Sequence, residues 1–217
     1  ACKKYSDLYL GDSKVESAIY KSAFLLYSRF HFKDAADSFR SVIARWPNSS
    51  NAEFSANLIL DALKIREEYV SLRDSARTFY EQKDLGSATF KKDMYNIWSR
   101  AAYTVIDEDF KKSQNHGATA DALLAFSQQF PDFEKVDVGL NNAAFYYYKA
   151  DRVADSMKVR HILVDDPKFG PKTKYYYAQV AALGFDYERL ADFQKASEYY
   201  DKLLELYPAE RPKVEKA

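Results

Sequence analysis

Histidines and paired carboxylates, the side chains that most often carry catalysis, are sparse in this chain. The three histidines lie far apart and outside any His-Glu-x-x-His metal motif: His31, His116 and His161. Asp165 and Asp166 stand directly before Pro167, which is more typical of a helix end and turn than of an acid–base pair. No glycine-rich phosphate loop and no Gly-x-Ser-x-Gly nucleophile motif occurs. The sequence therefore predicts no enzyme activity, no catalytic residue, no cofactor and no metal site.

Tyrosine is unusually abundant, with 18 residues beside 15 phenylalanines. Two runs of three, at 146–148 and 175–177, could stack on sugar rings, because tyrosine offers an apolar face and a polar edge. Three consecutive residues of a helix point to three different sides, so at least one tyrosine of each run belongs to a core. The runs leave open both glycan binding and ordinary packing.

The single cysteine, Cys2, follows Ala1. This pair resembles the end of a bacterial lipobox, in which a small residue precedes the cysteine that receives lipid. The resemblance implies a lipid anchor at Cys2, whereas the plainer alternative is a sequence that starts beside a cysteine. One cysteine allows neither an internal disulfide nor a cysteine-based metal site.

Composition narrows the classes of partner. The 217 residues carry 32 Lys and Arg and 32 Asp and Glu, so the net charge is zero. A general nucleic-acid binder needs a basic surface, so we expect no nucleic-acid partner. No apolar run approaches 18 residues, so we expect membrane association only through an anchor at Cys2. Six glycines and six prolines are few, as a helical chain requires.

The stretch from Val180 to Pro208 predicts a helix hairpin. Large residues at Val180, Leu183 and Tyr187 recur three and four apart, on one side of a helix. Gly184 lies between them, where the missing side chain lets a second helix approach. The returning helix repeats the pattern and stops at a proline: Ala196, Tyr200, Leu203 and Pro208.

This spacing resembles the tetratricopeptide repeat. Seven positions recur near the N-terminus, each displaced by 161 residues: Ile19, Ala23, Leu26, Phe32, Ala35, Phe39 and Pro47 match Val180, Gly184, Tyr187, Phe193, Ala196, Tyr200 and Pro208. The resemblance implies an all-α fold, an alpha-alpha superhelix (a TPR-like solenoid) of about five helix hairpins.

We expect a leader or linker at 1–12, a repeat domain at 13–208 and a charged tail, or the start of a further helix, at 209–217. The predicted hairpins cover about 14–45, 51–82, 87–130, 135–165 and 171–207. Their mean interval is about 40 residues rather than the 34 of a regular array. We assign the excess to longer helices in the middle of the chain. Within the third hairpin, Asn115–Gly117 is the predicted turn, because asparagine and glycine tolerate positive φ.

Stacked repeats bind partners on a concave surface formed by the first helix of each hairpin. In the tetratricopeptide repeat, the exposed residues of that helix are the second, fifth, ninth and twelfth. This register predicts a mainly aromatic ligand-binding face: Tyr20, Phe24, Tyr27, Asn141, Phe145, Tyr148 and Phe185. Such a face suits an apolar helix or an extended hydrophobic or proline-rich segment. The alternative is that these rings pack within the superhelix or under a terminal helix.

Two functional hypotheses follow. The favoured one is a non-catalytic scaffold that docks a protein or peptide segment, within a bacterial cell-envelope assembly. The alternative is a helical accessory domain of a peptidoglycan enzyme, or a glycan-binding module. The polar segment 48–53, which joins the first two hairpins, is followed by a pattern that resembles repeat proteins of deltaproteobacterial envelopes, including gliding-motility components. This similarity covers the second and third hairpins. That similarity implies a periplasmic or outer-membrane lipoprotein location; without it, a cytoplasmic scaffold is expected.

Overall fold

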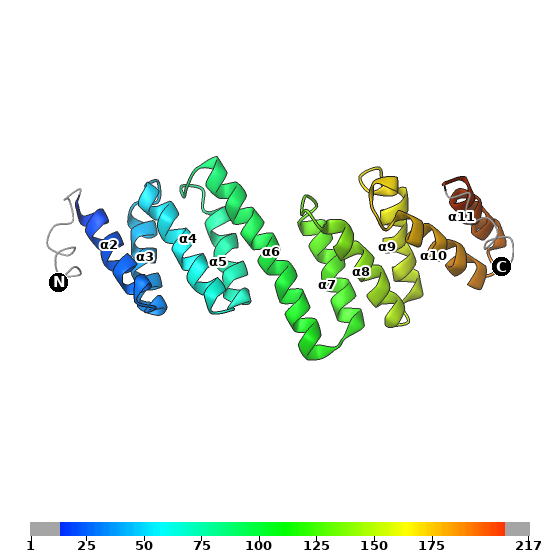
Figure 1. The fold of residues 1–217 in the computed structure, drawn as a ribbon, viewed down its shortest axis with the longest axis horizontal. Helices are drawn as coiled ribbons and strands as arrows, with labels where there is room; N and C mark the ends of the chain where they lie inside the picture. The colour runs from blue at the N-terminus through cyan, green and yellow to red at the C-terminus, as the bar shows by residue number, and fades with distance from the viewer. Residues whose placement is uncertain (1–13, 207–217) are drawn as a thin grey trace. The chain divides into compact units, whose positions relative to one another are not determined.

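A computed structural model of the chain describes residues 14–206. Cys2 and the predicted leader and tail lie outside this range. Within it the protein consists of ten α-helices and one short 3-10 helix, with 81% of the residues helical and no strand. The all-α prediction is confirmed, and consecutive helices pack against their neighbours as hairpins (Figure 1).

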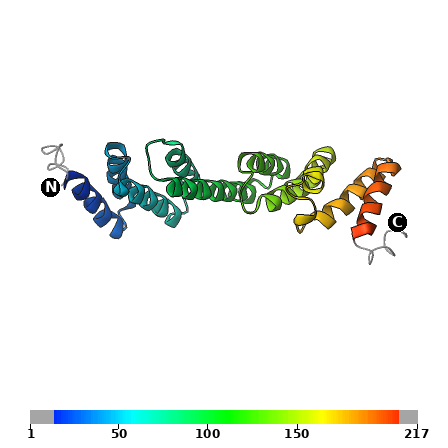
Figure 2. The same cartoon turned by 90° about the horizontal axis from the view of Figure 1, so that it is seen from above.

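The helices and their bounds are α2 (Lys14–Ser28), α3 (Phe32–Arg45), α4 (Ser50–Ile65), α5 (Tyr69–Glu81), α6 (Ala88–Ser113), α7 (His116–Gln129), α8 (Val136–Lys149), α9 (Val153–Asp165), η1 (Gly170–Lys172), α10 (Tyr176–Arg189) and α11 (Phe193–Leu206). The antiparallel pairing of α2 with α3 and of α10 with α11 can be followed in Figure 2. We number the hairpins from one to five, α2/α3 to α10/α11.

The chain divides into two compact units, which meet inside α6 between Val105 and Ile106. Unit 1 holds α2 to α5 and most of α6, and unit 2 holds the end of α6 and α7 to α11.

Four hairpins turn through the same backbone motif. One non-glycine residue in each turn has a positive φ between 56° and 63°: Phe30, Glu67, Asp151 and Ala191. In the first hairpin the amide of Phe30 bonds to the carbonyl of Tyr27, and that of His31 bonds to Leu26, 3.0 Å away. The other three turns repeat both bonds. This is the Schellman arrangement, which satisfies carbonyls that the helix end leaves free.

The third hairpin turns differently, and the prediction of a turn at Asn115–Gly117 is wrong. The residue with positive φ is Gln114, at 52°. Asn115 is instead the N-cap of α7, and its side chain accepts a hydrogen bond from the amide of Ala118 at 3.0 Å. Gly117 lies inside the first turn of α7. At Asn115 the hydrogen bond that caps the helix start outweighs the preference of asparagine for the left-handed region.

The turns give every hairpin a common numbering, counted from its left-handed residue. Seven positions before that residue, the first helix carries a buried residue that faces the second helix: Ala23, Leu60, Ala144 and Gly184 in hairpins one, two, four and five. In hairpin four the hydroxyl of Ser156 donates to the carbonyl of Ala144 at 2.7 Å, so the backbones approach closely there. Small residues at the crossing allow close approach in hairpins one, four and five, whereas hairpin two carries Leu60 there.

Successive turns are separated by 37, 47, 37 and 40 residues, from Phe30 to Ala191. The longest interval contains α6, which has 26 residues. About half of the excess over a regular array of 34-residue repeats therefore lies in the interval that contains α6, and the other three intervals share the rest. Within residues 14–206, no helix is both long and apolar enough to span a membrane.

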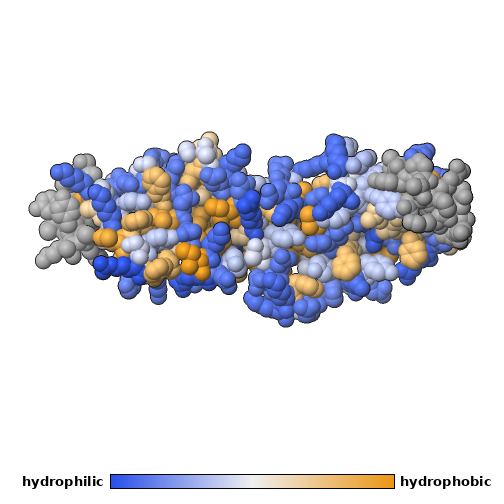
Figure 3. Space-filling model, viewed as in Figure 1, coloured by the Kyte–Doolittle hydropathy of each residue, from blue (hydrophilic) through white to orange (hydrophobic). Residues whose placement is uncertain are grey.

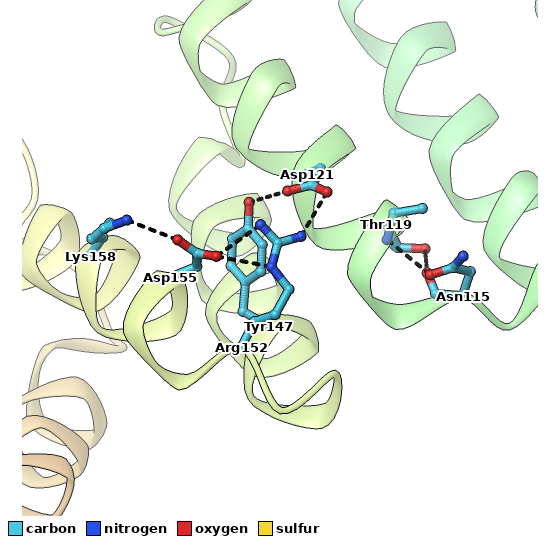
Figure 4. A network of polar contacts seen from close by, with 8 residues as sticks. Asn115, Thr119, Asp121, Tyr147, Arg152, Asp155 and Lys158 are labelled. Atoms are coloured by element: carbon cyan, nitrogen blue, oxygen red, sulfur yellow. Dashed lines mark hydrogen bonds and ion pairs between the residues drawn. The ribbon is translucent and has the colours of Figure 1, made fainter. Parts of the chain in front are cut away.

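A polar network joins three helices of unit 2 (Figure 4). The hydroxyl of Tyr147 in α8 donates to Oδ1 of Asp121 in α7 at 2.8 Å. Arg152 bonds to the other oxygen of Asp121 and to Asp155, and its guanidinium lies 4.6 Å from the centroid of the Tyr147 ring. The bonds from Arg152 and Tyr147 lower the pKa of Asp121, and burial raises the pKa of Tyr147 to about 12.

Candidate functional site

Three exposed phenylalanines occupy one position of the repeat, six residues before the left-handed turn residue. They are Phe24, Phe145 and Phe185, with 46%, 50% and 51% of their surface exposed. We call this set the phenylalanine register. The second hairpin carries Asp61 at the same position.

The first helix of each hairpin orients these rings. The residue directly before each phenylalanine is buried against the second helix: Ala23, Ala144 and Gly184. The next side chain is turned by about 100° around the helix axis, since the helix has 3.6 residues per turn. The same periodicity that buries the small residue therefore presents the ring to solvent.

A cation accompanies the register in unit 2. The ammonium of Lys149 lies 5.4 Å from the centroid of the Phe145 ring, and the guanidinium carbon of Arg189 lies 5.9 Å from that of Phe185. Each cation is four residues after its ring, which places both on one face of the helix. An apolar ring beside a cation can accept an apolar group together with an acidic one.

In unit 1 the register is part of an aromatic ladder on α2. The ring of Phe24 stacks between those of Tyr20 and Tyr27, with centroids 6.4 and 6.3 Å away. The hydroxyl of Tyr27 donates to the carboxylate of Asp61 in α4. Burial, followed by this bond, raises the pKa of Tyr27 to about 12. The sequence-predicted residues of α2 therefore form one contiguous face, which is bonded to the first helix of the next hairpin.

Apolar patches interrupt the hydrophilic surface on the face drawn in Figure 3. Unit 1 also has exposed apolar residues outside the phenylalanine register. They include Leu25, Phe30, Phe54, Ile65 and Val70. The phenylalanine register is distinguished from them by its recurrence, not by exposure alone.

In unit 2, Asn141 serves a different purpose from the neighbouring aromatic residues. Its Oδ1 accepts a 2.8 Å bond from Nε2 of Gln179, which ties α8 to α10. One helical turn nearer the start of α8, Asp137 accepts from Thr173 at 2.8 Å. Tyr148 remains exposed beside Phe145. Of the predicted residues in this unit, the three aromatics are accessible and Asn141 is occupied by its own protein.

The seven predicted residues fall into two sets, three in unit 1 and four in unit 2. Each set forms its own face. The predicted set thus separates into an aromatic ladder on α2 and a mixed set on α8 and α10, while Cys2 lies outside the described residues.

The tyrosine runs are mostly packed. Tyr147 and Tyr176 are buried, and the Tyr146 ring contacts Phe110 and His116 at centroid distances of 4.7 and 5.6 Å. Tyr148 is the exposed member of the first run. These contacts favour packing over glycan binding for the runs as a whole.

His161 is held in a cluster that sequence reasoning missed. Its Nδ1 lies 2.7 Å from Asp165 and its Nε2 lies 2.9 Å from the hydroxyl of Tyr187. The hydroxyl of Tyr199 is 3.2 Å from Nδ1, and the rings of Tyr187 and Tyr199 stack. Both ring nitrogens are engaged, so the cluster joins α9, α10 and α11. Over residues 14–206 there is no group of three or more His, Cys, Asp or Glu that could hold a metal ion.

No protein-family model and no curated protein sequence matches this chain.

Proposed function

We propose that this protein is a non-catalytic scaffold of the tetratricopeptide type, whose first-helix faces dock an apolar or aromatic-compatible segment of a partner protein. The observation that carries the proposal is the phenylalanine register. The same position bears a half-exposed phenylalanine in hairpins one, four and five. An exposed phenylalanine adds little to folding, so its recurrence at one position is better explained by contact with a partner.

The tetratricopeptide assignment is supported by one displacement that recurs in the residue types and in the helix bounds. The 161-residue displacement relates seven positions of the sequence. The helices α3 and α11 begin and end at positions displaced by the same 161 residues, from Phe32–Arg45 to Phe193–Leu206. We extend the proposal to a bacterial envelope or periplasmic assembly, with a lipid anchor at Cys2.

The chemistry of the faces defines the class of segment that would bind. Aromatic side chains supply large contact areas and dominate binding energy at protein interfaces. Lys149 and Arg189 beside the rings of unit 2 favour a segment with acidic residues between apolar ones. On α2, where Ser28 stands four residues after Phe24, a purely apolar segment is favoured.

The test uses peptides selected from a random display library against the whole chain. In the triple variant Phe24→Ala, Phe145→Ala, Phe185→Ala, the affinity of the selected peptides should fall by about tenfold or more, because each truncated anchor residue costs about 1–2 kcal/mol. Val70→Ala, an exposed apolar residue of α5, is the control and should bind as the wild type does.

Peptides that bind the triple variant as tightly as the wild type would overturn the proposal. Sedimentation with peptidoglycan tests the glycan-binding alternative. Sedimentation that persists in the triple variant and disappears in Tyr148→Ala would favour that alternative instead.

A further inference from the structure

Two polar pairs join hairpins four and five, and in each pair the residue of α10 is buried. Arg160 of α9 and Asp186 of α10 form an ion pair with Nε and Oδ2 3.4 Å apart, and Asp186 is 2% exposed. Asn141 of α8 and Gln179 of α10 form the 2.8 Å hydrogen bond described above. Both pairs connect two facing surfaces. We call the side of a hairpin that faces the next hairpin its outgoing face, and the side that faces the preceding hairpin its incoming face.

The common numbering identifies the equivalent residues on the two terminal faces. Hairpins four and five have the same bounds displaced by 40 residues, from α8 Val136–Lys149 to α10 Tyr176–Arg189. On the outgoing face of hairpin five, Tyr200 therefore stands where hairpin four has Arg160, and Ala181 stands where it has Asn141. Hairpins one and five are displaced by 161. On the incoming face of hairpin one, Leu25 and Ala18 therefore replace Asp186 and Gln179.

Both members of each pair change polarity together. The pair Arg160–Asp186 corresponds to Tyr200 with Leu25, and Asn141–Gln179 corresponds to Ala181 with Ala18. A charged residue packed against an apolar one would cost free energy. Between hairpins four and five, polar residues face polar ones. The equivalent residues on the outgoing face of hairpin five and the incoming face of hairpin one are instead mainly apolar on both sides. The outgoing face of hairpin five is thus suited to the incoming face of hairpin one.

Exposure agrees with an unfilled interface. Leu25 is 61% exposed, although the equivalent Asp186 is buried. On α11 a groove of about 310 Å³ is lined by Phe193, Ser197, Tyr200 and Leu204, with Glu188 and Asp201 as its charged members. α10 packs against one side of α9. By the 40-residue displacement, this groove lies on the corresponding side of α11.

The charges at the rims are complementary. Lys21 takes the position of Ala182, which lies between Gln179 and Asp186 on the stripe of α10 that faces α8. Glu188 takes the position of Tyr148 on the opposing helix. The incoming face therefore carries a lysine and the outgoing face carries Glu188 and Asp201, so the two faces bear charges of opposite sign.

We propose that the outgoing face of α10 and α11 binds α2 of a second copy of this chain, head to tail. The interaction is heterologous, because it uses two different surfaces of the same protein, and it continues into larger assemblies or closes into a ring. It uses other residues than the phenylalanine register, so it goes beyond the partner docking proposed above.

Analytical ultracentrifugation of the whole chain over a range of concentrations tests the proposal. The average mass of the wild type should rise with concentration. Leu25→Asp inactivates the incoming face and Ser197→Arg fills the groove, so each variant alone should stay at the mass of one chain. Mixed in equal amounts, they retain one intact face each and should form a species of two chains and nothing larger.

Val70→Asp introduces the same charge at an exposed position of α5, and this variant should associate as the wild type does. Melting curves of both variants verify that they are folded. A wild type that stays at the mass of one chain at millimolar concentration would overturn the proposal. So would Leu25→Asp protein that associates like the wild type, or a mixture that forms no two-chain species.

Discussion

The ring of Tyr200 fills the space that Gly184 leaves at the crossing of α10 and α11. A Cβ atom placed on Gly184 would lie 2.6 Å from Cε1 and 2.8 Å from Cδ1 of Tyr200. Cβ atoms essentially never approach non-bonded atoms that closely, so the ring and the glycine depend on each other. The first hairpin has the related pair Ala23 and Phe39 at these positions, both buried.

Gly184→Ala should therefore lower the free energy of unfolding by about 1–3 kcal/mol, because the Tyr200 ring must move out of its place. The measurement is equilibrium denaturation by urea. In the background of Tyr200→Ala, which removes the ring, the same substitution should cost much less. Equal costs in both backgrounds would show that the ring does not limit the crossing.

Ala191→Gly should stabilise the protein by up to about 1 kcal/mol. Ala191 has a φ of 58°, where a side chain carries a steric cost that glycine avoids. Ala125→Gly is the matched control, because Ala125 is exposed inside α7 with ordinary helical geometry. That substitution should destabilise by about 0.5–1 kcal/mol, so the two changes are expected to have opposite signs in the same denaturation assay.

These turns show where sequence reasoning about the fold succeeds and where it stops. Three- and four-residue spacing of apolar side chains identified the helices, and the 161-residue displacement identified the hairpins. The left-handed residues could not be found in the same way, since they are Phe30, Glu67, Asp151 and Ala191 rather than glycine or asparagine. Each of them closes a turn with the paired hydrogen bonds of the Schellman motif, which can hold a residue other than glycine in the left-handed region. At Asn115–Gly117 the prediction failed for a different reason, because Asn115 caps the start of α7.

Phe145→Ala should change the free energy of unfolding by less than about 1 kcal/mol, because half of this side chain is already in water in the folded protein. Phe130→Ala, in the same unit, removes a fully buried ring and should cost about 3–5 kcal/mol. Thermal and urea unfolding of both variants give the comparison. A large loss for Phe145→Ala would assign that ring to the core and remove it from the binding face.

Alkaline pH should weaken the fold between about pH 10 and pH 12. Burial raises the pKa values of Tyr27, Tyr147 and Tyr200 to about 12, against an ordinary value of 10.0. A pKa that is raised on folding gives stability that is complete below pH 10 and is lost as the pH rises through 12. Stability measured across this range should fall less steeply in Tyr147→Phe, and an unchanged slope would contradict the assignment.

The sequence predicted the residues of the candidate site, but not that they separate into two sets, one in each unit. In the tetratricopeptide repeat the ninth residue of the first helix is exposed, and this register, which the resemblance supplied, led to Phe24, Phe145 and Phe185, all about half exposed. The engagement of Asn141 depends on Gln179, 38 residues away, and no local pattern announces it. The same holds for His161, whose partners Tyr187 and Tyr199 come from two other helices.

The ion pair between Arg160 and Asp186 supplies the last prediction. Burial lowers the pKa of Arg160 and raises that of Asp186, so neither charge is well solvated. Asp186→Leu alone leaves the arginine buried without its partner and should cost about 3–5 kcal/mol.

The double variant Arg160→Tyr, Asp186→Leu installs at this junction the residue types of Tyr200 and Leu25 from the two terminal faces. Replacing a buried ion pair with packed apolar residues is often neutral or stabilising, so most of the lost stability should return. The measurement is a double-mutant cycle with Arg160→Tyr as the second single variant. A double variant no more stable than Asp186→Leu would show that tyrosine and leucine do not match at these positions, and the matching of the terminal faces would lose its physical basis.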